Sequence, residues 1–255
     1  MRALVFAIVA VASGCTVDGT PSGARKTGLV RLFQHAEGGG IISAQFGDDP
    51  CTTQVAGPCD VVFCPPAGAD AGATSSSPSA GKITEDGLLQ PVTLLVNPDG
   101  TYYPQPAGHL WNNRAERAAI HADGAAIPTF DGAVLAPAQG FFLAPVPVAP
   151  TPQQPNGPTI DRAADFTFSW QGTDPVHAII SSGNARVDCP FDGNPGSGAI
   201  PATALSLLPA GPARFDAWTR NLQQVLAGDY VVTLSAEEAG HYSGTGDYSG
   251  PLDLQ

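Results

Sequence analysis

Residues 164–172 read ADFTFSWQG, and this stretch decides the fold class. Phe166, Phe168 and Trp170 fall on one side of an extended chain, while Thr167 and Ser169 fall on the other. Such alternation is typical of a strand with one buried face. We therefore expect a β-strand that places three aromatic rings in a core.

Segments of strand length recur along the rest of the chain. They are rich in β-branched or aromatic residues and lie between turn signals: LVRLFQHA, IISAQF, DVVFC, GKIT, PVTLLV, TYY, RAAIHA, AIPTF, GAVLA, GFFLAPV, VHAIISS, ARVDCPF and DYVVTLSA. Asp-Gly pairs, which favour tight turns, lie at 86–87, 99–100, 123–124 and 131–132. The 30 glycines and 25 prolines disfavour long helices. The sequence predicts an all-β protein built from antiparallel β-sandwich lobes of the immunoglobulin-like kind.

Two segments are exceptions to this pattern. IPATALSLL, residues 200–208, has Pro201 just inside a first turn followed by good helix formers, which predicts a single short helix. RFDAWTRNLQQVLAG, residues 214–228, fits either a helical stripe or an alternating strand. We favour the strand, because DYVVTLSA needs a partner in an all-β neighbourhood.

A proline-rich segment divides the chain. APVPVAPTPQQPNGP lies between Ala144 and Pro158 and carries six prolines, which suit neither a helix nor a central strand. We therefore predict a first β-sandwich lobe at 28–148, a linker at 149–158 and a second lobe at 159–255.

The N-terminus predicts export. Arg2 precedes the apolar run in LVFAIVAVASGC, residues 4–15, and this run is shorter than the roughly 20 residues of a membrane-spanning helix. A basic start, a short apolar run and small residues before the cut describe a secretory signal peptide. The ending ASGC resembles the lipobox of bacterial lipoproteins, although Ala12 stands where Leu is usual. The resemblance implies a signal peptide at 1–14 and a lipidated tether at 15–27 that begins with Cys15; an ordinary cleaved signal is the alternative.

The same reasoning sets the expected location and partners. Acyl chains on Cys15 would hold the protein at a membrane, periplasmic or surface-exposed. Thr16, where lipoproteins retained in the inner membrane of enteric bacteria carry Asp, implies the outer membrane. The formal net charge of −12 and the lack of a basic stripe exclude nucleic acid as a partner.

The order of motifs carries a second resemblance. AGKITEDG, PVTLLVNPDGTY, GAAIPTFDGAVLAP, DFTFSWQG, RVDCPFDGNPGSGAIPATAL and LAGDYVVTLSA together resemble predicted two-lobed, β-rich lipoproteins of Gram-negative bacteria with large genomes. Those proteins are of unknown function, so the resemblance implies export and two β lobes and transfers no catalytic residue.

Four cysteines remain after the anchor, and an oxidising compartment favours disulfides between them. Cys59 and Cys64 are separated by a strand-length segment and cannot bond each other. We expect Cys51 to bond Cys59 rather than Cys64. Cys189 then either bonds Cys64 or stays buried as a free thiol, and we favour burial.

Catalytic motifs are lacking. There is no G-x-S-x-G, H-E-x-x-H, P-loop or G-x-G-x-x-G after a strand. His121, beside Asp123, and His177, three residues after Asp174, are either proton carriers or ordinary hydrogen-bonded histidines, and we favour the latter. We expect no enzyme; a secreted hydrolase with an unrecognised carboxylate or His/Asp site is the alternative.

One loop offers a weak calcium site. DCPFDGNPGSG supplies Asp188, Asp192, Asn194 and Ser197 as oxygen ligands, but it departs from the EF-hand frame. A plain turn between a strand and a helix is the favoured interpretation, so we expect no cofactor.

The function predicted from these features is binding, adhesion or a structural role in the cell envelope. Aromatic residues in Gly-, Pro- and Asn-rich turns are the candidates for contacting a glycan or an envelope protein: Tyr102, Tyr103, Trp111, Tyr242 and Tyr248.

Overall fold

The computed structural model describes residues 26–36, 38–47, 51–65, 77–98, 100–111, 116–137, 141–144, 157–172, 174–193, 196–242 and 249–255, with only the backbone path at 141–144 and 241–242. The described chain is almost entirely β, with one short helix, α1 (Ala202–Leu205). The prediction of an all-β protein with at most one short helix is confirmed.

One large sheet organises the structure. Nine of its eleven strands follow one another in this order: β3 (Thr52–Ala56), β4 (Cys59–Phe63), β14 (Ala185–Phe191), β13 (Val176–Ser182), β16 (Gly211–Ala227), β17 (Tyr230–Ala239), β1 (Lys26–Gln34), β2 (Gly40–Gly47) and β7 (Gln105–Ala107). The other two are β19 (Ser249–Leu254), which pairs with β16, and β11 (Thr159–Ile160), which pairs with β19.

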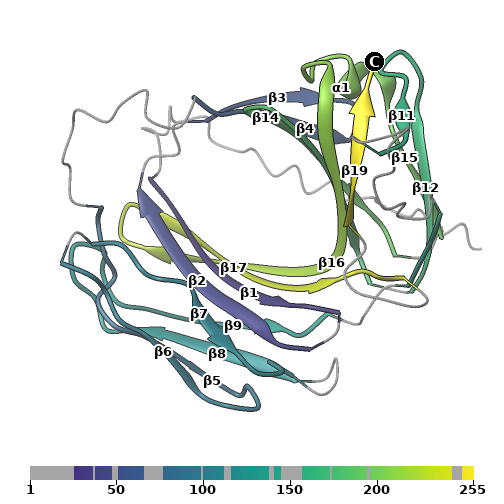
Figure 1. Ribbon diagram of the computed structural model, residues 1–255. Coiled ribbons are helices and arrows are strands. Elements are labelled where there is room, and N and C mark those ends of the chain that lie inside the picture. Colours follow the sequence, from purple (N-terminus) through teal and green to yellow (C-terminus); the bar gives the residue numbers. More distant parts are fainter. Residues whose placement is uncertain are drawn as a thin grey trace, which may run out of the picture.

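Two smaller sheets complete the fold. One consists of β15 (Ser197–Ile200), β12 (Phe166–Gln171), β10 (Phe141–Ala144) and β18 (His241–Tyr242). The other consists of β6 (Val92–Leu94), β5 (Ile83–Asp86), β8 (Arg117–Ala122) and β9 (Phe130–Leu135). The large sheet is strongly curved, and the smaller sheets lie on its outer side (Figure 1).

Two of the three sheets are mixed, whereas purely antiparallel sheets were predicted; the sheet of β6, β5, β8 and β9 is purely antiparallel. Parallel pairs join β1 to β17, β10 to β18 and β11 to β19. In each parallel pair the two strands lie far apart in the sequence, so a long connection is available to bring them together. The alternation of apolar residues cannot reveal this, because it is the same in parallel and antiparallel strands that have one buried face.

The alternation in ADFTFSWQG has the predicted consequence. Phe166, Phe168 and Trp170 of β12 are buried, and the Trp170 indole donates to the carbonyl of Gly193 at 3.1 Å. Phe168 stacks on Trp170 with 5.2 Å between ring centroids. Asp165, just ahead of the strand, accepts a hydrogen bond from the backbone N–H of Ala202 at the start of α1. This strand is thus the centre of one core.

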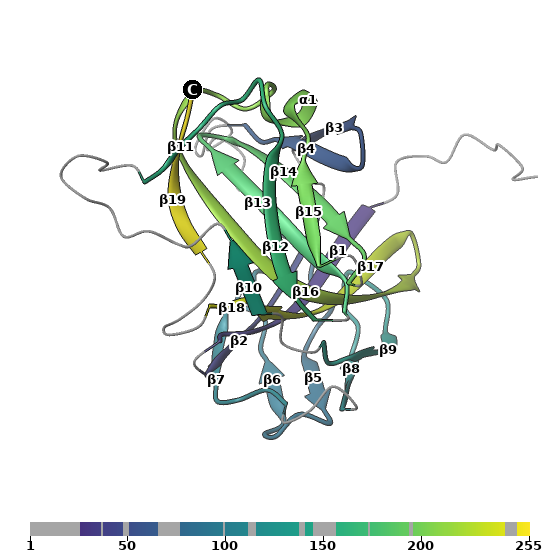
Figure 2. The ribbon, with the colours of Figure 1, turned by 90° about the vertical axis from the view of Figure 1, so that its right-hand side faces the viewer.

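The described residues form two hydrophobic cores. We call the strands that surround each core the first unit and the second unit. The first unit packs β5, β8 and β9 against β17, β1 and β2, and the second packs β12, β15 and α1 against β4, β14, β13 and β16. Strand β16 serves both, since its residues 213–219 pair with β13 and its residues 218–227 pair with β17. Figure 2 shows it crossing from one unit to the other.

The cores do not follow the predicted boundary at 149–158. Strands β3 and β4, from the expected first lobe, lie in the second unit, and β17, from the expected second lobe, lies in the first. Of the predicted linker, only Gly157 and Pro158 are described. The chain crosses between units more than once, which a single proline-rich segment does not reveal.

A candidate binding surface on the shared sheet

The large sheet has one face that neither core uses. Along β16, Phe215 and Ala217 enter the second core and Ala227 enters the first, so both small sheets cover the odd-numbered side of this strand. Side chains at even positions of β16 lie on the opposite side, which is the inner side of the curve in Figure 1. We call this side the concave face.

Strand register shows which residues share the concave face. In the first unit, rows across β16, β17, β1 and β2 read Arg220, Glu237, Phe33 and Ile41; Leu222, Ser235, Arg31 and Ser43; and Gln224, Thr233, Leu29 and Gln45. In the second unit, rows across β4, β14, β13 and β16 read Asp60, Asp188, Ile179 and Asp216; and Val62, Arg186, Ser181 and Arg214. The face therefore mixes arginines, acids, hydroxyls, amides and exposed leucines.

A charged cluster lies where the two units meet. His177 Nδ1 is 3.0 Å from Asp188 Oδ1, and Arg220 Nη1 is 3.9 Å from Asp188 Oδ2. Burial alone would raise the pKa of Asp188, but the hydrogen bond and charge of His177, with the charges of Arg220 and Arg186, outweigh burial and lower it. Asp188 is therefore held as a carboxylate.

A second ion pair adjoins the first. Arg31 Nε donates to Glu237 Oε2 at 2.7 Å, and the Ser235 hydroxyl donates to the other oxygen of Glu237, also at 2.7 Å. The Arg31 guanidinium lies over the rings of Phe33 and Trp218, 4.6 and 5.6 Å from their centroids. The Glu237 side chain is only 5% exposed, so its charge needs compensation, and Arg31 is the cation that it contacts directly.

This dependence predicts a stability effect. Arg31→Met is expected to lower the free energy of unfolding by about 3 kcal/mol, because it leaves a buried carboxylate without its cation. The double variant Arg31→Met, Glu237→Met is expected to recover most of that loss. Urea unfolding of the wild type, both single variants and the double variant measures the coupling, and additive losses would contradict it.

The cluster retains hydrogen-bond donors that the described residues do not satisfy. The indole N–H of Trp218 and the Nε–H of Arg220 have no hydrogen-bond partner among them. Burial lowers the pKa of Arg220, while the charges of Asp188 and Glu237 raise it. Both donor atoms are buried, but the carboxylates, the guanidinium groups and two aromatic rings around them stand close together on one rigid sheet. Such an arrangement is suited to recognising a polar ligand.

The aromatic residues expected from turns lie elsewhere. Tyr102 and Trp111 are 7% exposed and belong to the first core, so the expectation that they stand exposed in turns is wrong. The Tyr102 hydroxyl donates to the carbonyl of Gly81 and accepts from the N–H of Ala80, and the Trp111 indole donates to Glu238. Tyr103 is 69% exposed. The side chains of Tyr242 and Tyr248 lie outside the described residues.

Both histidines considered for proton transfer form pairs with aspartates. His121 contacts its cross-strand partner Asp131 at 2.7 Å and the predicted neighbour Asp123 at 3.5 Å. His177 contacts Asp188, which the sequence places eleven residues away. Each contact joins neighbouring strands of a sheet. Both residues are hydrogen-bonded histidines, which is the interpretation that we favoured from the sequence.

The weak calcium residues are divided by the strands. Asp188 points to the concave face and is paired with His177 and Arg220, while Ser197 is exposed on β15. Asp192 is exposed after β14, and Asn194 lies outside the described residues. Within the described part of the chain, no three His, Cys, Asp or Glu side chains form a group suited to a metal ion.

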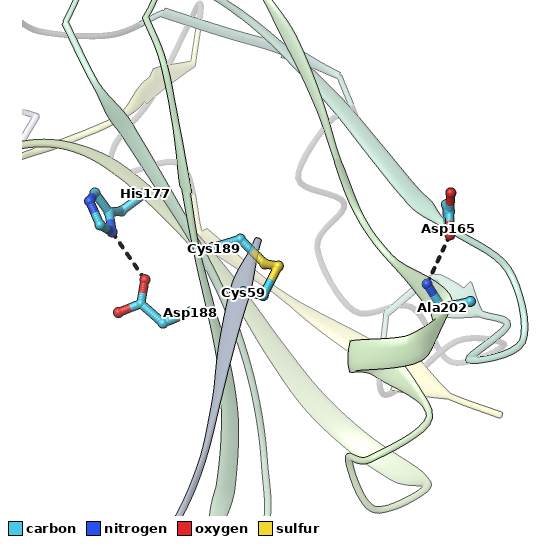
Figure 3. Close-up of a disulfide and its surroundings, with 6 residues drawn as sticks. All are labelled: Cys59, Asp165, His177, Asp188, Cys189 and Ala202. Atoms are coloured by element: carbon cyan, nitrogen blue, oxygen red, sulfur yellow. Dashed lines mark hydrogen bonds and ion pairs between the residues drawn. A yellow bond between two sulfur atoms is a disulfide. The ribbon is translucent and has the colours of Figure 1, made fainter. Parts of the chain in front are cut away.

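The disulfides differ from the expected pairing. Cys51 bonds Cys64, and Cys59 bonds Cys189, so the predicted Cys51–Cys59 bond and the free Cys189 are both wrong. Between Cys51 and Cys59 the chain forms β3, which pairs with β4 and places Cys51 and Cys64 side by side at the open end of this hairpin. Cys59 faces the second core beside Cys189 on β14 (Figure 3).

The predicted lipidation site, Cys15, lies outside the described residues, as do the expected signal peptide and most of the tether. Strand β1 begins at Lys26, two residues before the expected start of the first lobe at Gly28. None of the helices within the described ranges is long and apolar enough to cross a membrane.

Comparison with known proteins leaves the chain unassigned. No protein family model matches it, and no curated protein is significantly similar. A solved structure described as "Structural insight into host cell surface retention of a 1.5-MDa bacterial ice-binding adhesin" is similar at 12% identity, with a TM-score of 0.20, over 91% of this chain and 66% of that chain. At that TM-score the likeness supports no conclusion about this protein.

Sequence reasoning missed several residues of this surface. Arg31, Arg220 and Glu237 belong to no local motif that would single them out in the sequence. Their alternation with apolar residues places them on a strand face, but only the pairing of β1 with β17 and β16 brings them together.

Proposed function

We propose that the protein is an exported, lipid-anchored envelope protein that binds a ligand on its concave face without catalysis. The observation that carries the proposal is the continuous sheet face that spans both units and lies outside both cores. A rigid face bearing paired charges, exposed leucines and aromatic rings supports recognition.

Export has its own support. Two disulfides indicate an extracellular or envelope environment, because such bonds are rare in the cytosol. Attachment through Cys15 and location at the outer membrane remain part of the proposal. They rest on the lipobox-like ASGC ending and on Thr16.

We further propose that both units are immunoglobulin-like sandwiches. Each unit has two layers of mainly antiparallel strands around one core, as such sandwiches do, which supports this assignment.

The anchor gives a direct prediction. In cells fed labelled palmitate, the wild-type protein is expected to carry label and sediment with membranes, whereas Cys15→Ala is expected to lose the label and become soluble after export. The double variant Cys51→Ala, Cys64→Ala, which removes the disulfide with the smaller expected effect on stability, serves as the control for loss of cysteines. Membrane retention of unlabelled Cys15→Ala would contradict the lipid anchor.

The binding surface is tested by a blocking substitution. Thr233 lies in the middle of the concave face, and Thr93 lies exposed on a strand of a smaller sheet. Thr233→Trp is expected to reduce binding of the purified protein to washed envelopes of the producing bacterium by at least about tenfold, and Thr93→Trp to leave it unchanged. Equal binding by both variants would contradict the concave face as the site.

The hydrolase alternative has one observation in its favour, the hydrogen bond between His177 and Asp188. If the protein is a hydrolase, the wild type is expected to cleave an envelope polymer and His177→Gln to lose this activity. If the protein only binds, the wild type is expected to cleave no such polymer.

A further inference from the structure

A cavity of about 410 Å³ lies beside β2 in the first unit. Its wall includes Ser43 and Gln45, which belong to the concave face, and also Ala44 and Phe46, which belong to the core side of the same strand. A cavity that touches both sides of one strand must lie along the edge of that strand. The rest of the wall comes from Leu29 of β1 and from Ser77, Gly100, Thr101, Tyr102 and Pro104.

This part of the β2 edge has no partner strand among the described residues. Strand β7 pairs only with Gly40, Ile41 and Ile42. Pro106 is opposite Ile41 and has no N–H, so the ladder hydrogen bonds to β7 must come from Gly40 and Ile42. By the period of two, the N–H and C=O groups of Ala44 and Phe46 point to the same edge and face the cavity.

The lining of the cavity is uncharged. Its side chains are apolar, hydroxyl or amide, and no Asp, Glu, Lys, Arg or His is among them. The Tyr102 hydroxyl is already engaged with Ala80 and Gly81, so this residue offers its ring alone. Phe46 and Tyr102 form an aromatic pair on the core side, with 5.8 Å between ring centroids.

We propose that this cavity binds an extended, uncharged peptide of a partner protein by strand addition to Ala44–Phe46. An unpaired strand edge offers main-chain hydrogen bonds, and the side chains on its two sides select alternate residues of the peptide. Apolar side chains of the peptide would face Phe46 and Tyr102, and small polar ones would face Ser43 and Gln45. This site does not rest on the function proposed for the concave face.

The probe is the peptide acetyl-Thr-Val-Thr-Val-Thr-amide, titrated into the ¹⁵N-labelled protein. The amide signals of Ala44 and Phe46 are expected to shift. In an added strand only alternate amides point to β2. Two further peptides carry N-methyl groups, one on the two valine amides and the other on the threonine amides. One of the two is expected to bind about tenfold or more weakly, because its methylated amides point to β2, and the other is expected to bind normally.

Variants test the same geometry from the side of the protein. Ala44→Pro removes one edge N–H, and Ser43→Trp fills the cavity, so each is expected to weaken binding by about tenfold or more. Ser181→Trp, on the same face but on β13, which is paired on both sides, is the matched control and is expected to bind normally. The N-methylated peptides keep the test valid if Ala44→Pro fails to fold.

Three results would overturn the proposal: no shift at Ala44 and Phe46, equal loss from both N-methylated peptides, or preferential binding of a neutral sugar such as methyl glucoside that Ala44→Pro does not affect. Leu222→Trp, on β16 of the concave face and three strands away from β2, separates this site from the concave face. It is expected to bind the peptide normally even where it no longer binds envelopes.

Discussion

Replacing Cys59 and Cys189 together by alanine is expected to lower the free energy of unfolding by about 5 kcal/mol, since this bond closes the longer of the two loops. Its cysteines are 130 residues apart, and both are fully buried in the second core. The bond also ties β4, from the N-terminal part of the chain, to β14. Urea unfolding at neutral pH measures the loss.

The matched control is the other disulfide. Cys51 and Cys64 are 13 residues apart and close only the β3–β4 hairpin, so their double alanine variant is expected to lose about 3 kcal/mol. If this variant lost as much stability as the Cys59, Cys189 variant, the pairing described above would be contradicted. Peptide mapping without reduction gives an independent check of which sulfurs are joined.

The second large effect concerns pH and Glu85. This residue of β5 is fully buried, and neither carboxylate oxygen has a hydrogen-bond partner among the described residues. Burial raises the pKa of Glu85 from 4.5 to about 8. Between those values the unfolded chain gives up the proton and the folded chain keeps it, so the free energy of unfolding falls as pH rises. The expected fall is about 5 kcal/mol, and it levels off above pH 8.

Glu85→Gln is expected to remove this pH dependence, because the amide does not titrate. Asp86→Asn, at the neighbouring exposed position, is the control and is expected to leave it in place. Urea midpoints between pH 5 and pH 9 give the measurement. A wild-type protein whose stability does not change over that range would show that Glu85 is solvated or paired in solution.

Alternation made individual strands predictable. The aromatic face of β12, the strand character of β16 and the short helix α1 all follow from local patterns in the sequence. Strand β3 was missed because four of its five residues are exposed, which leaves no alternation to detect. The error in the disulfides followed from that omission.

Long-range pairing was not predictable from these patterns. The sequence shows which side of a strand is buried, but it does not show which strand lies beside it. The pairing of β1 with β17 and of β4 with β14 is therefore seen only in the structure. Gly132 gives a smaller example. It was expected in a turn, yet it lies within β9, where a Cβ atom would come within 2.3 Å of a Leu234 methyl carbon. Close packing, rather than a turn, accounts for this glycine.

The candidate surface could not be predicted from the sequence for the same reason. The concave face brings together residues that are more than 200 positions apart, such as Arg31 and Glu237, whose separation is 206. The composition of the turns instead suggested Tyr102 and Trp111 as exposed residues, and both are buried in the first core.

Hydroxyl-radical footprinting with and without washed envelopes tests the central claim most directly. Leu222 and Leu226 are 51% and 68% exposed on the concave face, whereas Leu89 and Leu135 are 44% and 39% exposed away from it. The account predicts that envelopes protect the first pair from oxidation and leave the second pair unchanged. Protection of Leu89 and Leu135 with none at Leu222 and Leu226 would contradict binding through the concave face.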